Sequence, residues 1–404
     1  LKSRADLYCF FSLCSWTMSL RTILSCIKKE TKYLCVLNAC SLNSTTAWGH
    51  RYYFNLNQFS KRCYNTSETQ FKQLLVNSYG EPEEVVSLNV MTLPDSIKGT
   101  EVLARVLAAP VNPADINTIQ GTYAYKPQFP FVPGNEGVLE VLEVGEDVKE
   151  LKKGDRIIPK LNAIGTFRSA LVAEENNFIK IPSDIDPILA STIAVNPCTA
   201  YRMIKDYVPL QDGDVIIQNL ANSAVGQAVI QIAADKGIKT INIVRPRPDL
   251  DKLKDFLESL GATLVIPLPD MRKNKDLLNE LPKPRLGFNG VSGKDAAELI
   301  RMMDEGGTVV TYGGMARQPL FVPVGELIFR DIIFRGYWMT RWNLQHKDDP
   351  ERITMLDYLF DLVRRGKLVP PPHELVPIED FKTALRLAMP AKGMTNRKQI
   401  LVFN

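Results

Sequence analysis

The chain has 404 residues, of which 45% are hydrophobic and 23% charged, and its formal net charge is +4 at neutral pH. That length allows two domains with well-filled cores. The basicity is local: residues 1–64 hold nine Lys/Arg against two acids, Asp6 and Glu30, so residues 65–404 carry a net charge of −3. The body therefore gives no indication of a nucleic-acid surface.

Residues 1–64 have the composition of a targeting segment. Met18 is a plausible start, and the sequence after it is rich in Ser, Thr, Lys and Arg and nearly free of acids. This composition predicts a disordered mitochondrial transit peptide, cut close to residue 64, and a protein of the mitochondrial matrix. A secretory signal is the alternative, because residues 7–20 are apolar and follow two basic residues. The lack of a small-residue cleavage site argues against it.

Cysteine is distributed in the same uneven way. Six of the seven cysteines lie in the leader, and Cys198 is the one cysteine of the body. Such a body has neither a disulfide framework nor a thiolate zinc cage. No apolar run approaches the roughly 18–20 residues that cross a bilayer, so the sequence predicts a soluble protein without a transmembrane segment.

Residues 71–180 are rich in short strands, Pro and Gly, which predicts a compact β-barrel-like domain. Residues 129–145 are expected to form a pair of strands within it. Helices take over from residue 186, the first over residues 190–204 with a break at Asn196-Pro197.

Residues 213–247 predict a βαβ unit. The strand 215–220 is a continuous, largely apolar run, as expected for a parallel strand that is covered on both faces. The helix 225–235 follows a short loop, and a second strand runs over 239–245. The free N–H groups and the dipole of the helix N-terminus favour a phosphate. The loop is a weak motif, however, since Gly226 is its one glycine.

Arg245 and Arg247 follow the second strand, where an NAD-specific fold places a carboxylate on the ribose 2′-OH. Two guanidinium groups suit the dianionic 2′-phosphate of NADPH. The alternative is a pair of solvated arginines in a turn, which Pro246 and Pro248 mark.

The remaining elements continue the alternation. Helices are expected over 249–260 and 293–303, strands over 263–267 and 307–312, an apolar strand over 331–338 and a charged helix over 350–365. The simplest arrangement is a β domain interrupted by a Rossmann sheet, with the C-terminus returning to the first domain. The boundary between the two would be a ligand-binding cleft.

Several motifs together resemble one protein family from about residue 70 to the end of the chain. They are VNPADINTIQGTY, PFVPGNEGV, VNPCTAYRM, NSAVGQAVIQIAA, VRPRPDL, TYGGM and GYWMTRW. The sequence resembles the medium-chain dehydrogenase/reductase superfamily and, within it, the mitochondrial trans-2-enoyl-thioester reductases. The resemblance implies an α/β fold, in which a GroES-like β-rich catalytic domain (65–195) is joined to a Rossmann doubly wound parallel sheet (196–337). Residues 338–404 would return to the catalytic domain, and the active site would lie in the cleft.

The zinc-dependent alcohol dehydrogenases of this superfamily carry a Gly-His-Glu signature whose histidine binds the metal. Here the signature reads Gly134-Asn135-Glu136, and the three histidines, at positions 50, 346 and 373, lie elsewhere. Without Cys or His ligands nothing is expected to hold a catalytic zinc ion.

The resemblance assigns the catalytic role to Tyr123, the tyrosine of the Q-G-x-Y element. A phenol with a pKa of about 10 is a protonated donor at neutral pH. It can stabilise the thioester oxygen as charge builds there, or relay the proton to the α-carbon. Without the resemblance, Tyr123 and Tyr125 would be interpreted as packing residues.

The resemblance also implies the contacts to NADPH. They fall on Asn196, Asn222, Ser223, Ala224, Val225, Arg245, Arg247, Tyr312, Gly313, Gly314, Met315, Tyr337, Trp338, Met339 and Lys398. Relatives usually have glycine in place of Ala224, and a modest loss of affinity at most is expected because positive φ is not needed there. Pro246 replaces a more common acidic residue. Trp338 could instead be a core aromatic residue.

Three functions remain open. The first is NADPH-dependent reduction of enoyl thioesters on CoA or acyl-carrier protein, the last reductive step of mitochondrial type II fatty-acid synthesis. The second is a quinone or other enone reductase, and the third is a non-catalytic NADPH-binding interaction protein. The resemblance also implies a homodimer, formed through the apolar strand near residues 331–336 at the edge of the Rossmann sheet.

Overall fold

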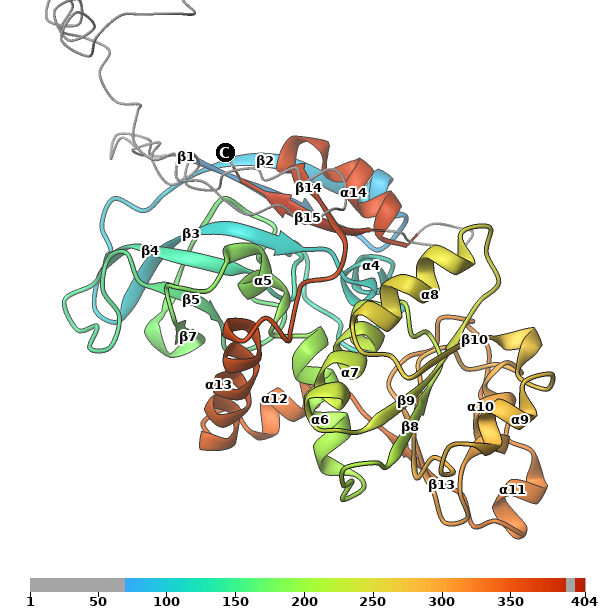
Figure 1. Cartoon of the computed structure of the whole chain (residues 1–404). Helices are drawn as coiled ribbons and strands as arrows, with labels where there is room; N and C mark the ends of the chain where they lie inside the picture. Colours follow the sequence, from blue (N-terminus) through green and yellow to red (C-terminus); the bar gives the residue numbers. More distant parts are fainter. Residues whose placement is uncertain (1–69, 390–396, 404) are drawn as a thin grey trace, which may run out of the picture. The chain divides into compact units, whose positions relative to one another are not determined.

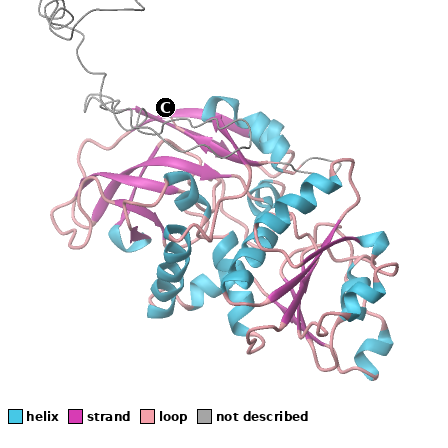
Figure 2. Cartoon of the chain, in the orientation of Figure 1, coloured by secondary structure: helices cyan, strands magenta, loops and turns pink. Residues whose placement is uncertain are grey.

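The computed structural model describes residues 70–389 and 397–403, all within the compact unit that the chain forms from Tyr64 onward. The predicted transit peptide, residues 1–64, lies outside these described residues. The described strands fall into two larger sheets and a hairpin-like pair (Figure 2).

The first sheet combines strands from both ends of the described chain. Its strand order is β14-β15-β3-β4-β5-β7, and β6 also pairs with β3. The strands are β3 (Glu101–Pro110), β4 (Val138–Val144), β5 (Arg156–Pro159), β6 (Ala170–Glu174), β7 (Phe178–Ile181), β14 (His373–Pro377) and β15 (Lys398–Val402). Strand β15 runs antiparallel to β3, with Ile400 opposite Pro110. The C-terminal strands therefore complete a sheet that begins about 270 residues earlier.

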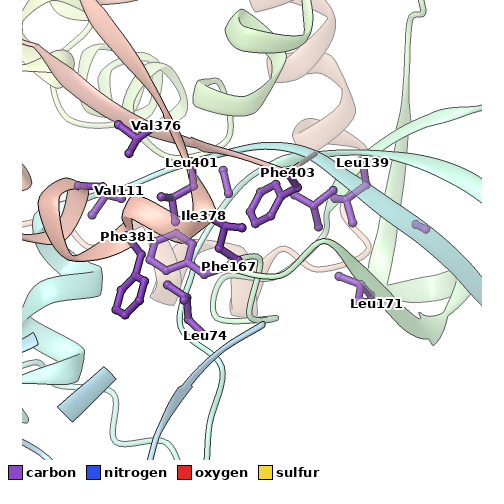
Figure 3. Packing of buried hydrophobic residues seen from close by; sticks show 14 of the residues in the cluster. Leu74, Val111, Leu139, Phe167, Leu171, Val376, Ile378, Phe381, Leu401 and Phe403 are labelled. Carbon is purple, nitrogen blue, oxygen red and sulfur yellow. The ribbon is translucent and has the colours of Figure 1, made fainter. Parts of the chain in front are cut away.

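A core of aliphatic and aromatic side chains fills the space between this sheet and the antiparallel pair β1 (Gln70–Val76) and β2 (Val86–Thr92). Leu74, Leu139, Phe167 and Leu401 are fully buried in it (Figure 3). Burying each side chain of this size stabilises the fold by about 1.5–3 kcal/mol. This core fixes the position of β3 and therefore of the loop that follows it.

The second sheet is parallel throughout, with the order β10-β9-β8-β11-β12-β13. Its strands are β8 (Val215–Gln218), β9 (Lys239–Val244), β10 (Leu264–Pro267), β11 (Leu286–Asn289), β12 (Thr308–Thr311) and β13 (Ile333–Gly336). All four residues of β8 are buried, which confirms the strand predicted from its continuous apolar run. The strand order reverses between β8 and β11, and doubly wound sheets bind ligands above such a switch point.

Helices cover both faces of the parallel sheet (Figure 1). They are α7 (Ala224–Asp235), α8 (Leu250–Ser259), α9 (Lys275–Asn279) and α10 (Ala296–Met302). Helix α11 (Val324–Ile328), which precedes β13 in the chain, has no buried residue. The other described helices are α3 (Pro82–Val85), α4 (Pro113–Ile119), α5 (Pro187–Thr192), α6 (Asn196–Asp206), α12 (Met339–Gln345), α13 (Pro350–Arg364) and α14 (Phe381–Ala388). Short 3-10 turns occupy 175–177, 268–270 and 378–380. The predicted α/β fold class is confirmed.

Two local predictions were wrong. Helix α10 begins at Ala296 and not at residue 293, because Ser292 and Gly293 have φ values of 64° and 67°, which a right-handed helix cannot accommodate. Residues 129–145 form one strand, β4, and not a pair, since the segment before it contains Pro130 and Pro133, which lack the N–H groups that a strand ladder needs.

Candidate active site

A cavity of about 1090 Å³ lies at the carboxyl ends of the parallel strands. Residues that follow β8, β9, β12 and β13 form one wall, and the loops around α4 and the start of β15 form another. All the residues predicted to bind the cofactor, and Tyr123, line this one cavity. The structure thus brings together side chains that are far apart in the chain, such as Asn112 and Lys398, 286 positions apart.

The turn from β8 into α7 presents a helix N-terminus to the cavity. Ser223 is the N-cap residue, and its hydroxyl accepts a hydrogen bond of 3.1 Å from the Gly226 N–H. A Cβ on Gly226 would lie 2.5 Å from the Ala221 carbonyl oxygen, so this glycine allows the helix to pack closely on the strand. Ala224 is the first helical residue and lines the cavity, and its φ is not positive. A helix N-terminus of this kind has free N–H groups and a dipole that favour a phosphate.

The charges on the cavity wall fit a polyanionic nucleotide. Five cationic residues line it, and no Asp or Glu does so within the described part of the chain. Arg245 and Arg247 directly follow β9, and Arg247 donates to the Asp249 carboxylate at 2.6 Å, which holds its side chain in place. The donor set therefore suits the diphosphate and the 2′-phosphate of NADPH.

Tyr123 is held by the turn that ends α4. Gly121 has a φ of 69°, and a Cβ there would lie 2.6 Å from the Tyr79 ring. The backbone N–H groups of Thr122 and Tyr123 both donate to the Asn117 carbonyl, at 2.8 and 3.1 Å. This tight turn fixes the direction in which the phenol enters the cavity.

The hydroxyl of Tyr123 meets Trp338 across the cavity. The indole Nε1–H donates to the phenol oxygen at 2.7 Å, and the two rings lie edge to face at 83°. Because the phenol oxygen accepts this bond, its own proton is available for a ligand. Burial raises the pKa of Tyr123 above its usual value, more than the bonds from Trp338 and Thr340 lower it. The phenol is therefore protonated at neutral pH. Trp338 lines the cavity and is not enclosed in the core.

The sequence did not indicate a buried polar cluster beside Lys398. Asn112, Asp115 and Glu136 are at most 3% exposed, and burial raises the pKa of the Asp115 carboxyl to about 6 and that of Glu136 to about 7. Asn135 and Glu136 had been noted for the altered metal signature. No sequence signal connects Glu136 to Asn112, which donates a hydrogen bond to it, or Asn112 to Lys398, which donates to Asn112.

Within residues 70–389 and 397–403, no three His, Cys, Asp or Glu side chains gather as metal ligands would. Cys198 is buried, and burial raises the pKa of its thiol to about 12. The helices in the same part of the chain are too short or too polar to cross a membrane.

The chain matches two family models. Residues 98–183 match the alcohol dehydrogenase GroES-like domain, and residues 224–355 match the zinc-binding dehydrogenase model. The first confirms the GroES-like part of the predicted fold, and the second matches the parallel-sheet part.

The chain is similar to the mitochondrial enoyl-[acyl-carrier-protein] reductase of Homo sapiens, with 47% identity over 82% of this chain and 88% of that protein. The enzyme of the same name from Arabidopsis thaliana is 42% identical over 82% of this chain and 88% of its own length. A solved structure of Etr1p with NADP and crotonyl-CoA superposes with a TM-score of 0.77 at 30% identity, covering 82% of this chain and 99% of that one. A putative NADPH:quinone reductase from Bacillus thuringiensis shares the fold at 24% identity and a TM-score of 0.72, covering 82% of this chain and 99% of that one.

Proposed function

This chain belongs to the mitochondrial enoyl-thioester reductases of the medium-chain dehydrogenase/reductase superfamily, and from that membership we propose how its residues carry out the reaction. The enzyme uses NADPH to reduce trans-2-enoyl thioesters to saturated acyl thioesters, and it works in the mitochondrion. We propose that it catalyses the last reductive step of type II fatty-acid synthesis there, on thioesters of CoA or acyl-carrier protein.

When NADPH is bound, it supplies a hydride to the β-carbon of the enoyl thioester. Negative charge then develops on the thioester oxygen, and that oxygen needs a donor that is already in place. We assign this role to Tyr123, whose proton is left available because Trp338 donates to the phenol oxygen. Trp338 thereby orients the phenol, and the raised pKa of Tyr123 keeps it protonated at the pH of the mitochondrion.

The contacts proposed for NADPH run along the cavity. Arg245 and Arg247 hold the 2′-phosphate, and the first turn of α7 holds the diphosphate. Asn196, Tyr337 and Lys398 bind the nicotinamide half near Tyr123. The observation that supports this best is the cavity wall, which combines cationic side chains, a helix N-terminus and the phenol of Tyr123.

The chain is divided, in this proposal, into a catalytic domain over 65–195, a nucleotide domain over 196–337 and a C-terminal return over 338–404. Two features of the sheets support it. The parallel strands β8–β13 fall between residues 215 and 336, and β15 pairs with β3.

The two other functions differ from this one in whether NADPH is oxidised and in which hydride acceptor is preferred. A quinone or enone reductase would oxidise NADPH faster with quinones, and a non-catalytic protein would bind NADPH without turnover. We expect oxidation of NADPH with crotonyl-CoA and little with quinones, measured by the loss of absorbance of the reduced nicotinamide. Preference for a quinone in that assay would reject the enoyl-thioester assignment.

We propose that two copies of the chain associate through the outer edge of the parallel sheet. Strand β13 pairs on one side, with β12, among the described residues. Beside it, helix α11 and its flanks expose apolar side chains: Phe321, Val324, Leu327, Ile328 and Phe329. Phe329 is 79% exposed, and apolar patches of this kind mark protein interfaces. The solved Candida tropicalis relative Etr1p/Etr2p is a heterodimer.

If the dimer forms through this patch, one charged residue introduced into the patch should disrupt it. Light scattering should give a homodimer for the wild type and a monomer for Phe329→Asp, because a carboxylate cannot be desolvated there without a partner. Arg272→Asp, at an exposed site of the same domain outside the apolar patch, should remain dimeric. A monomeric wild type would refute the proposal.

A further inference from the structure

The buried polar groups beside the cavity form one connected network, here called the Asn112 cluster. It consists of Asn112, Asp115, Glu136, Asn196 and Lys398. These residues come from the start of α4, the loop before β4, the first turn of α6 and the start of β15. The cluster thus lies where the catalytic domain, the nucleotide domain and the C-terminal return meet.

Asn112 is the centre of the cluster. Its backbone N–H donates to Asp115 Oδ2 at 2.8 Å, and its side-chain Nδ2 donates to Glu136 Oε1 at 2.7 Å. Its Oδ1 accepts two further bonds, from Lys398 Nζ at 2.6 Å and from Asn196 Nδ2 at 3.2 Å. The amide oxygen therefore accepts two bonds, and one N–H of the amide nitrogen has a defined acceptor.

The hydrogen-bond partners at its two ends fix the orientation of the Asn112 amide. Its NH₂ group must face the Glu136 carboxylate, and its oxygen must face the Lys398 ammonium, since a flipped amide would set donor against donor at one end and acceptor against acceptor at the other. The Asn112 oxygen accepts from the NH₂ group of Asn196, which fixes the orientation of the Asn196 amide as well. The carbonyl oxygen of Asn196 is then the atom that this residue offers to a ligand.

Glu136 also holds the helix that carries Asn196. Its second oxygen, Oε2, accepts from the Val195 N–H at 2.9 Å, and Val195 is the N-cap residue of α6. One carboxylate thus controls both the position of the α6 N-terminus and, through Asn112, the rotamer of Asn196.

Joining these elements would not require ionisable groups. Burying carboxyl and ammonium groups is costly, and an apolar cluster of the same volume would join the segments at least as well. The cluster differs from apolar packing in that its members Asn196 and Lys398 also line the cavity, where a carbonyl oxygen and an amino group can meet a ligand.

We propose that Glu136 and Asn112 are positioning residues that set Asn196 and Lys398 for the nicotinamide end of NADPH. A carboxamide has one donor group and one acceptor group, so an acceptor on Asn196 and a donor on Lys398 match it. This inference rests on the proposed function for the location of the nicotinamide. Its test is a measurement of NADPH binding as well as of activity.

The test exchanges the carboxylate and the amide between the two positions. In Glu136→Gln, the new NH₂ must face either the Val195 N–H or the NH₂ of Asn112, both of which are donors. The Asn112 amide is expected to rotate, and the dissociation constant and KM for NADPH should rise about tenfold, because buried donors lose their acceptors. The kcat at saturating NADPH should change less, since Tyr123 is not a member of the cluster.

The double variant Glu136→Gln/Asn112→Asp restores the pattern of donors and acceptors. The new glutamine accepts from Val195 and donates to the new aspartate, which accepts from Asn196 and Lys398, and the net charge of the cluster is that of the wild type. NADPH binding, measured by titration calorimetry, should return to within about twofold of wild type. Glu140→Gln is the matched control, because Glu140 pairs with Arg105 on neighbouring strands outside the cavity.

The melting temperature of each variant shows whether weaker NADPH binding results only from a less stable fold. The inference fails if folded Glu136→Gln binds NADPH as the wild type does, or if the double variant binds no better than the single variant. It also fails if Glu140→Gln weakens NADPH binding as much as Glu136→Gln does. Failure of the proposed function would instead appear as wild-type protein that binds NADPH and does not reduce crotonyl-CoA.

Discussion

Tyr123→Phe is expected to lower kcat for crotonyl-CoA reduction by about 10²–10³-fold, the usual cost of removing one donor to a developing oxyanion. The dissociation constant for NADPH should stay close to that of the wild type, because the ring and its edge-to-face contact with Trp338 are kept. Single-turnover kinetics under saturating NADPH measures the chemical step directly.

The same substitution has a small effect on folding. The Trp338 N–H loses its acceptor, which costs about 1 kcal/mol of stability at a partly buried site, so the variant should fold. Tyr125→Phe is the matched control, since Tyr125 is 43% exposed and lies two positions away in the same segment. Tyr123→Phe with nearly wild-type turnover, or Tyr125→Phe with an equal loss, would remove the assignment.

Replacing both Arg245 and Arg247 by alanine is expected to abolish the preference for NADPH. Hydrogen bonds to charged groups contribute about 1.5–3 kcal/mol each, so each arginine accounts for about tenfold to hundredfold in the KM for NADPH. The KM for NADH should change little, because the free ribose lacks the dianion that the guanidinium groups bind. Steady-state kinetics with both nucleotides measures this ratio.

Arg272→Ala is the control for a general loss of positive charge. Arg272 is 72% exposed on the same domain and pairs with Glu298 away from the cavity, so the KM for NADPH should be unchanged. If the ratio of the KM values for NADPH and NADH is unchanged in the double variant, the arginines do not bind the 2′-phosphate.

The fold could be predicted from the sequence wherever local pattern decides the structure. Strand β8 was predicted from a continuous apolar run, and helix α7 as the helix 225–235 of the same βαβ unit. The start of α10 was missed because an apolar pattern does not reveal that Ser292 adopts a positive φ. Pro130 and Pro133 argue against a second strand in this segment, because proline lacks the N–H group that a strand ladder needs.

The candidate site could be predicted only in part. Arg245 and Arg247 were predicted because strand ends have a fixed role in nucleotide binding, and Tyr123 through the family resemblance; the structure places all three at the cavity. The bond from Trp338 to Tyr123 spans 215 positions, and the bond from Lys398 to Asn112 spans 286. Such pairs depend on how the domains pack, and residue spacing carries no information about that.

The most direct test of the central claim is the position of the label in the product made with NADPH deuterated at its hydride-donating carbon. The account predicts a butyryl thioester with deuterium at the β-carbon and a proton from solvent at the α-carbon, as mass spectrometry or NMR would show. A product without deuterium, or unchanged crotonyl thioester in a preparation that binds NADPH, would contradict it.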